Sequence, residues 1–167
     1  MTSTIDASAS AVQERLQWAV DELEIEIPSW GFANTGTRFR VWKQAGTPRT
    51  VEEKVDDAGT VHRYTGIATT VAVHIPWDKV DDYGALLAYM GSKGLKMGAV
   101  NSNTFQDDEY MLGSLCHPSA DVRQQALDAI IECCRIAEQT NAPAVKVWLG
   151  DGTNYPGQDH LLSRKHR

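Results

Sequence analysis

The chain has 167 residues, a formal net charge of −6 and a pI of about 5.3. That length suggests one domain, large enough to bury a hydrophobic core. The acidic balance argues against nucleic acid or an anionic membrane surface as a partner. No stretch reaches the roughly 18 apolar residues of a membrane-spanning helix, and the N-terminus lacks the layout of a signal peptide. Three cysteines without a CxxC pair or an even framework indicate a reducing cytoplasm.

In chain order, apolar residues at helical spacing first predict a leading helix within residues 1–24. A short strand over residues 25–27 follows and ends in the turn PSWGF. The polar, glycine-rich connection from 33 to 49 is long, which is typical of a functional or disordered loop. Residues 50–62 are charged and predict a helix, whereas the β-branched run of residues 69–75 predicts the clearest strand.

The second half of the chain continues the alternation of strands and helices. A helix is expected over 81–93 with Gly94 at its end, followed by a strand over 96–100, a long helix from Ser119 and a strand over 144–149. A last helix begins near His160. Four strand–helix units predict an α/β fold with parallel strands and crossover helices.

Two α/β architectures fit this order. A doubly wound open sheet commonly carries a Gly-rich phosphate turn after its first strand, and PSWGFANTG does not match that motif. A TIM-barrel type (β/α)8 fold needs about 250 residues, so this chain would hold its first four β/α units as a half-barrel. We expect residues 1–167 to form this single N-terminal half, with residues 1–24 as its leading helix.

Aromatic and polar residues collect at the carboxyl ends of the predicted strands, where ligands bind in both architectures. Taken alone, His74 in HIPWD fits a structural histidine, and Asp78 fits the cap of the following helix. Three tryptophans at these ends, Trp30, Trp77 and Trp148, fit a core as well as a pocket. Repetition of the pattern favours a shared pocket, and rings with a few hydrogen-bonding groups suit a sugar.

Other candidates for chemistry are weaker. The acidic run 107–109 fits a solvated loop or a helix start, and His62 and His117 fit structural roles. Cys133 and Cys134 lie in mid-helix and are expected in the core. No HExxH, GxSxG or Walker pattern occurs, and no spaced set of His, Asp and Glu predicts a metal site in the chain.

Long motifs at the strand ends resemble one family. They read PSWGFANTGTRFRVW, VHRYTGIATTVAVHIPWDKVDDY, NSNTFQDDEYMLGSLCHP and KVWLGDGTNYPGQD. Together they resemble the N-terminal half of a bacterial L-rhamnose isomerase of the broad-specificity type, within the xylose isomerase-like TIM barrels, over about residues 25–159. The resemblance implies an aldose–ketose isomerase of the L-rhamnose to L-rhamnulose type. It also implies two divalent metals, often Mn²⁺, a small-molecule sugar substrate and a homo-oligomer.

The resemblance also implies roles for individual residues. His74 would contact the sugar in ring opening or binding, Trp30 and Trp148 would line the sugar pocket, and Trp77 would pack beside them. Phe39 would belong to a loop that reaches a neighbouring subunit's site. The family's metal ligands and catalytic lysine lie on later strands, so this chain alone is expected to be inactive. A ketose 3-epimerase of the same superfamily and a non-catalytic sugar-binding half-barrel remain the alternatives.

Overall fold

The computed structural model describes residues 3–37, 40–148 and 160–167. The elements in chain order are α1 (Ser3–Asp21), β1 (Glu26–Pro28), the 3-10 turn η1 (Ser29–Gly31), β2 (Gly36–Thr37), β3 (Arg40–Val41), α2 (Val51–Thr65), β4 (Thr70–Ile75), α3 (Tyr83–Ser92), β5 (Lys96–Ser102), η2 (Asp108–Leu112), α4 (Ala120–Thr140), β6 (Val145–Val147) and α5 (Leu161–His166). The predicted alternation of strands and helices is confirmed. The small antiparallel β2–β3 hairpin in the long connection was not predicted, because two-residue strands carry no periodic pattern.

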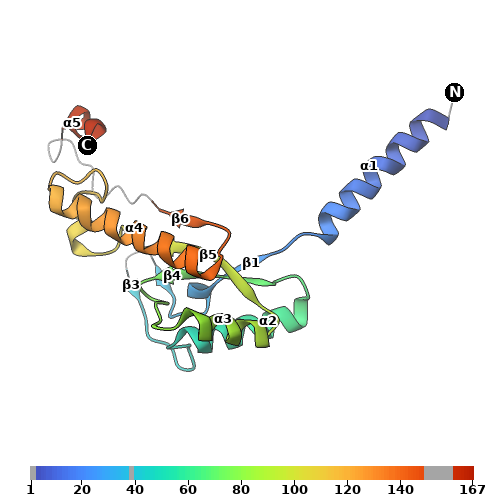
Figure 1. The fold of residues 1–167 in the computed structure, drawn as a ribbon, viewed down its shortest axis with the longest axis horizontal. Coiled ribbons are helices and arrows are strands. Elements are labelled where there is room, and N and C mark those ends of the chain that lie inside the picture. The colour runs from blue at the N-terminus through green and yellow to red at the C-terminus, as the bar shows by residue number, and fades with distance from the viewer. Residues whose placement is uncertain (1–2, 38–39, 149–159) are drawn as a thin grey trace.

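Strands β1, β4, β5 and β6 form one parallel sheet in that order. Each strand pairs with the next parallel strand along the chain, so the strand order does not reverse within the described sheet. Helix α3 contacts both α2 and α4, and α2 and α3 lie side by side along the sheet in Figure 1. The three helices therefore form one layer against the sheet, which makes the fold an α/β fold.

Apolar side chains between this sheet and these helices form the core. Val71 and Val73 of β4 share one cluster with Val55 of α2 and Met90 of α3, and all four side chains are fully buried. Burying one such side chain stabilises the fold by about 1.5–3 kcal/mol. Because side chains alternate along a strand, His74 faces away from the helices, toward the other face of the sheet.

The start of α3 differs from the prediction. Asp82, not Asp78, caps this helix, and its Oδ1 accepts a hydrogen bond from the Ala85 backbone N–H at 2.9 Å. Asp78 is 1 % exposed and lies four residues before the cap. Gly94 follows the helix with a φ of 75°, a conformation that glycine adopts at low cost, as the sequence predicted.

The long helix α4 begins directly after Ser119, as predicted. Its cysteines differ in burial, since Cys133 is 1 % exposed and Cys134 is exposed. The prediction of a core position was therefore wrong for Cys134. Neighbouring helical residues point about 100° apart, so one of the two lies outside the apolar stripe.

Polar contacts of Glu26 connect several strands on the face of the sheet opposite the helices. Glu26 of β1 forms an ion pair with Lys146 of β6, although β4 and β5 lie between these strands. The other Glu26 oxygen accepts a hydrogen bond from the Ala99 N–H at 2.6 Å, where the register of β5 against β4 is irregular. In a flat sheet, outer strands three spacings apart would be separated by roughly 14 Å. The ion pair therefore indicates a sheet that curves toward this face.

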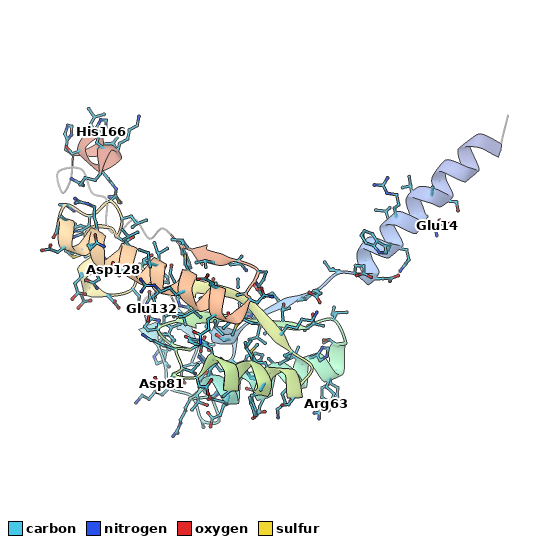
Figure 2. All side chains as sticks on the ribbon, in the orientation of Figure 1. Glu14, Arg63, Asp81, Asp128, Glu132 and His166 are labelled. Carbon is cyan, nitrogen blue, oxygen red and sulfur yellow. The ribbon has the colours of Figure 1, made fainter. Side chains whose placement is uncertain are left out.

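Helix α1 projects away from the sheet and its covering helices (Figure 1). In Figure 2 the side chains that are drawn on this helix, Glu14 among them, have no other described element beside them. Val12, Leu16 and Val20 form an apolar stripe along it and are exposed. Across the described residues, the structure holds no helix that combines the length and the apolar character needed to cross a membrane.

Candidate functional site

The carboxyl ends of the four parallel strands meet at a cavity of about 320 Å³. This volume lies in the range of about 300–1,000 Å³ that is typical of small-molecule sites. The lining residues are Trp30, His74, Trp77, Asn101, Ser102, Phe105, Lys146, Val147 and Trp148. The structure thus brings together four of the five residues predicted for the site. The fifth, Phe39, lies outside the described residues.

Local hydrogen bonds turn the chain at the end of β4 and hold His74 at the cavity. The Asp78 N–H donates to the His74 carbonyl oxygen at 2.8 Å, and the Lys79 N–H donates to that of Pro76 at 3.1 Å. This compact turn ends the strand and places Trp77 one residue before Asp78. His74 and Trp77 consequently meet on the same side of the turn.

Aromatic rings surround the imidazole of His74. The Trp77 ring stacks on it, with 4.0 Å between the centroids and 21° between the planes. The Trp30 ring meets it edge-on at 5.2 Å, and Phe105 lies 6.1 Å away. Phe105 also contacts Trp148 at 5.0 Å. This chain of rings connects the ends of four strands.

The tryptophans of the cavity are not core residues. Trp77 is 45 % exposed and Trp148 is 68 % exposed, while Trp30 is half-buried. An aromatic face that is open to solvent beside buried polar atoms suits the C–H face of a sugar ring. The pocket interpretation of these strand ends therefore fits Trp77 and Trp148 better than the core interpretation does.

Two residues that line the cavity each have a buried polar atom without a hydrogen-bond partner. Among the described residues of the lining, these atoms are Nδ1 of His74 and Oγ of Ser102. Leaving such an atom unpaired costs about 1–3 kcal/mol. Asn101 is held in place, because its Nδ2 donates to the Val73 carbonyl oxygen at 3.1 Å.

The surroundings of His74 favour a neutral ring. Burial is the main cause that lowers the pKa of His74 below its ordinary value, and the positive charge of Lys54 adds to this effect. The Ile75 backbone and the negative charge of Asp78 oppose the shift without cancelling it. Although the Ile75 backbone lies near the ring, no hydrogen bond of good geometry satisfies Nδ1. A neutral imidazole can accept a proton near neutral pH.

The buried carboxylate of Asp78 stabilises the turn after β4. Its carboxylate accepts hydrogen bonds from Lys54 Nζ at 2.5 Å, from the His74 N–H at 2.8 Å and from the Ser29 hydroxyl. Sequence reasoning missed Lys54 in this role. One signal for it exists, because Lys54 lies between Val51 and Ala58 on the buried face of α2, where a charge needs a partner.

The sequence analysis also left five lining residues unassigned, and Val147 is one of them. Asn101, Ser102 and Phe105 belong to the motif NSNTF, so their position at or just after the end of a strand was a usable signal. Lys146 carried no such signal. The strand β6 has three residues, too few for its alternation to show which face Lys146 occupies.

The weaker candidates lie away from the cavity. His117 has a structural contact, since its Nδ1 accepts a hydrogen bond from the Ser119 N–H at 3.0 Å. His62 has a buried Nδ1 on α2, and the acidic run 107–109 is exposed at the start of η2. Among the described residues, no three His, Cys, Asp or Glu side chains gather where they could hold a metal ion.

Comparison with known proteins gives two relatives that are named as probable sugar isomerases. The chain is 40 % identical over 142 residues to a protein of Rhizobium meliloti and 40 % identical over 144 residues to one of Mesorhizobium japonicum; each is named a probable sugar isomerase. The matches cover 82 % and 83 % of this chain but 33 % of each relative, so the chain spans about a third of the length of these curated relatives. No family model matches the chain. The names of these relatives give a class of reaction and no particular sugar.

Proposed function

We propose that this chain forms the sugar-binding part of an aldose–ketose isomerase of the L-rhamnose to L-rhamnulose type. The observation that carries the proposal is the cavity in which the buried His74 stands between Trp30 and Trp77. The identity to two probable sugar isomerases supports the same reaction class. Sugar substrate and homo-oligomeric assembly belong to the proposal through the family resemblance, and a cytoplasmic location belongs to it through the pattern of cysteines.

The proposed fold of this part is the first four units of a (β/α)8 barrel in one domain. Three features support it: the strands are in chain order, the helices form one layer, and Glu26 and Lys146 meet across the inner face. A barrel wall has its strands in chain order, its helices in one outer layer and its sheet curved toward the inner face, because the strands close on themselves. The ion pair between Glu26 and Lys146 fits that curvature. In a doubly wound sheet the helices cover both faces and the strand order reverses.

In the proposed reaction, the rings bind the sugar and His74 opens it. The exposed faces of Trp77 and Trp148 would stack on the sugar, and the neutral imidazole would accept the proton of the anomeric hydroxyl. The C1–O5 bond then breaks, its electron pair goes to O5, and the imidazolium returns the proton to O5. The product is the open-chain aldose. A positioned proton-transfer group of this kind contributes about 10²–10⁴-fold to a rate.

The divalent metals implied by the resemblance do not fit the residues described here. No side-chain cluster of the described chain offers three ligands, so no step of the proposal passes through a metal. The proposal assigns the metal, Mn²⁺ in the family, to the part of a relative's length that the match leaves uncovered.

The test uses a completed enzyme in which this chain is joined to the part of the Rhizobium meliloti relative that the match leaves uncovered. The substitution His74→Asn keeps a hydrogen-bonding side chain and removes the titratable ring. We expect turnover of L-rhamnose to fall by about 10²–10⁴-fold, with Mn²⁺ binding and melting temperature little changed. Turnover is measured by formation of the ketose, and stability by thermal unfolding on the same preparation.

The matched control is His117→Asn, which changes the same side chain outside the cavity and should keep turnover. If His74→Asn lowers the melting temperature while turnover per folded molecule survives, His74 is structural and the proposed role is wrong. Products separate the alternatives as well. A C3-epimerised ketose from a ketose substrate would indicate an epimerase, and tight sugar binding without turnover would indicate a binding module.

A further inference from the structure

We propose that Lys54, Asp78 and Ser29 form a buried positioning network that sets the geometry of the aromatic wall of the sugar cavity. This inference rests on the proposed function, because the wall is assigned to sugar binding there. The three side chains come from α2, the turn after β4 and η1. They are called the Lys54–Asp78–Ser29 network below.

Both oxygens of the Asp78 carboxylate are engaged. Oδ1 accepts from Lys54 Nζ at 2.5 Å, while Oδ2 accepts from the His74 N–H at 2.8 Å and from the Ser29 hydroxyl. The Asp78 side chain is 0 % exposed and the Lys54 side chain is 8 % exposed, so water hardly reaches the ion pair. The hydrogen bonds from Asp78 to His74 reach its backbone and not its ring.

The Asp78 carboxylate accepts hydrogen bonds from two segments of the chain, and each of these segments contains an aromatic ring of the cavity. Ser29 directly precedes Trp30, and Asp78 directly follows Trp77. His74 itself stands between these rings, 5.2 Å from one centroid and 4.0 Å from the other. One carboxylate thus determines the relative positions of three rings that arrive from two separate segments of the chain.

The energetics of burial indicate that position, rather than stability, is the main contribution of this network. A buried ion pair loses in desolvation much of what it gains in attraction, and well-packed apolar residues often stabilise as well or better. Charge-assisted hydrogen bonds, however, are short and directional, and they define where their partners lie. Apolar contacts alone would hold the strand ends together without fixing the orientation of each ring.

The chain also contains an exposed ion pair for comparison. Lys79 is the next residue after Asp78 and pairs with Glu132, and the two side chains are 51 % and 39 % exposed. Glu132 lies on α4, where Figure 2 labels it. This pair joins the same turn to a helix, and neither of its residues is among those that line the cavity. Glu132→Gln is therefore a matched control for loss of an ion pair at this turn.

The experiment measures ring geometry and sugar binding separately from stability. Three variants of the completed enzyme described above are compared with its wild type: Ser29→Ala, Asp78→Asn, and the double variant Lys54→Met/Asp78→Asn, which removes both charges. The ring current of Trp77 shifts the NMR signals of the His74 imidazole protons, and this shift reports the stacking. Binding of L-rhamnose is followed by tryptophan fluorescence, and stability by thermal unfolding.

We expect Asp78→Asn to lose most of the ring-current shift and to raise the dissociation constant for L-rhamnose by about tenfold or more, the loss typical of a hydrogen bond to a charged group. Ser29→Ala should show a smaller change in the same direction. The double variant should regain melting temperature, because no unpaired charge stays buried, while ring-current shift and affinity stay impaired. Glu132→Gln should keep the wild-type ring-current shift and the wild-type affinity for L-rhamnose.

The inference is overturned if Asp78→Asn and Ser29→Ala, measured while folded, keep the wild-type ring-current shift and affinity. It is equally overturned if the double variant restores geometry and affinity together with the melting temperature, since the network would then act through stability alone. A completed wild-type enzyme that does not bind L-rhamnose would count against the proposed function. The ring-current comparison would still decide the role of the network in that case.

Discussion

His74 shows at the residue scale how burial creates the chemistry of this site. The ring is 6 % exposed, and burial lowers its pKa below the ordinary value of about 6.5. Between the lower folded pKa and the unfolded pKa, the unfolded chain binds a proton that the folded chain does not bind. The stability that neutral His74 contributes is therefore fully present above about pH 6.5 and decreases as the pH falls through this window.

This linkage predicts a difference between the wild type and His74→Asn. The free energy of unfolding of the wild type should decrease more from about pH 7 to about pH 5 than that of the variant, because the variant has no imidazole to protonate at this position. Urea unfolding at both pH values measures the two slopes. Parallel pH dependences, whatever the absolute stabilities, would contradict a lowered pKa at His74.

At the scale of elements, the contacts that Glu26 makes across the sheet depend on the glycine at position 98. A Cβ at Gly98 would lie 2.5 Å from Oε2 of Glu26, and 3.0 Å from backbone atoms of Val71 and Ala72. The Glu26 carboxylate can reach the Ala99 N–H because Gly98 leaves this space open. Glycine at this position thus allows strands β1, β4 and β5 to approach on the inner face.

The substitution Gly98→Ala should destabilise the chain by about 1–3 kcal/mol, the usual cost of forcing extra volume into a packed site. Gly91→Ala is the matched control, because a Cβ at this α3 position meets no atom within 4 Å. Alanine in place of glycine in a helix should stabilise by roughly 0.5–1 kcal/mol. Urea unfolding of both variants measures the difference. If Gly98→Ala has the same free energy of unfolding as the wild type, a side chain at this position costs no stability and the prediction is wrong.

At the scale of the whole molecule, the structure exposes strand edges and apolar side chains that folded proteins usually cover. Within the described sheet, β1 pairs only with β4 and β6 pairs only with β5, so both outer strands have a free edge. Such edges are templates for association. The apolar stripe on the projecting helix α1 and the open faces of Trp77 and Trp148 add exposed apolar surface.

We therefore predict that the isolated chain self-associates or is only marginally stable. Size-exclusion chromatography with light scattering measures the mass, and thermal unfolding measures the cooperativity. Deleting residues 1–21 removes the stripe of α1 and leaves both strand edges, so association that survives the deletion is due to the edges or the cavity face. A full-length chain that remains a cooperatively unfolding monomer would contradict the prediction.

The sequence by itself determined the main strands and helices and the place where they collect functional residues. The β-branched run over residues 69–75 and the helical spacing over 120–140 are local properties, so these strands and helices follow from them. The location of His74, Trp30, Trp77 and Trp148 at strand ends was equally readable, because parallel strands bring their carboxyl ends to one edge.

Only the tertiary structure decided which distant residues meet. Asp78 reads as a helix cap in the sequence, yet it binds Lys54 and Ser29, which are 24 and 49 residues away. Glu26 and Lys146 are 120 residues apart and meet across two intervening strands. Strand order and sheet curvature bring such pairs together, and both result from the packing of the whole chain. Periodicity within one segment does not encode them.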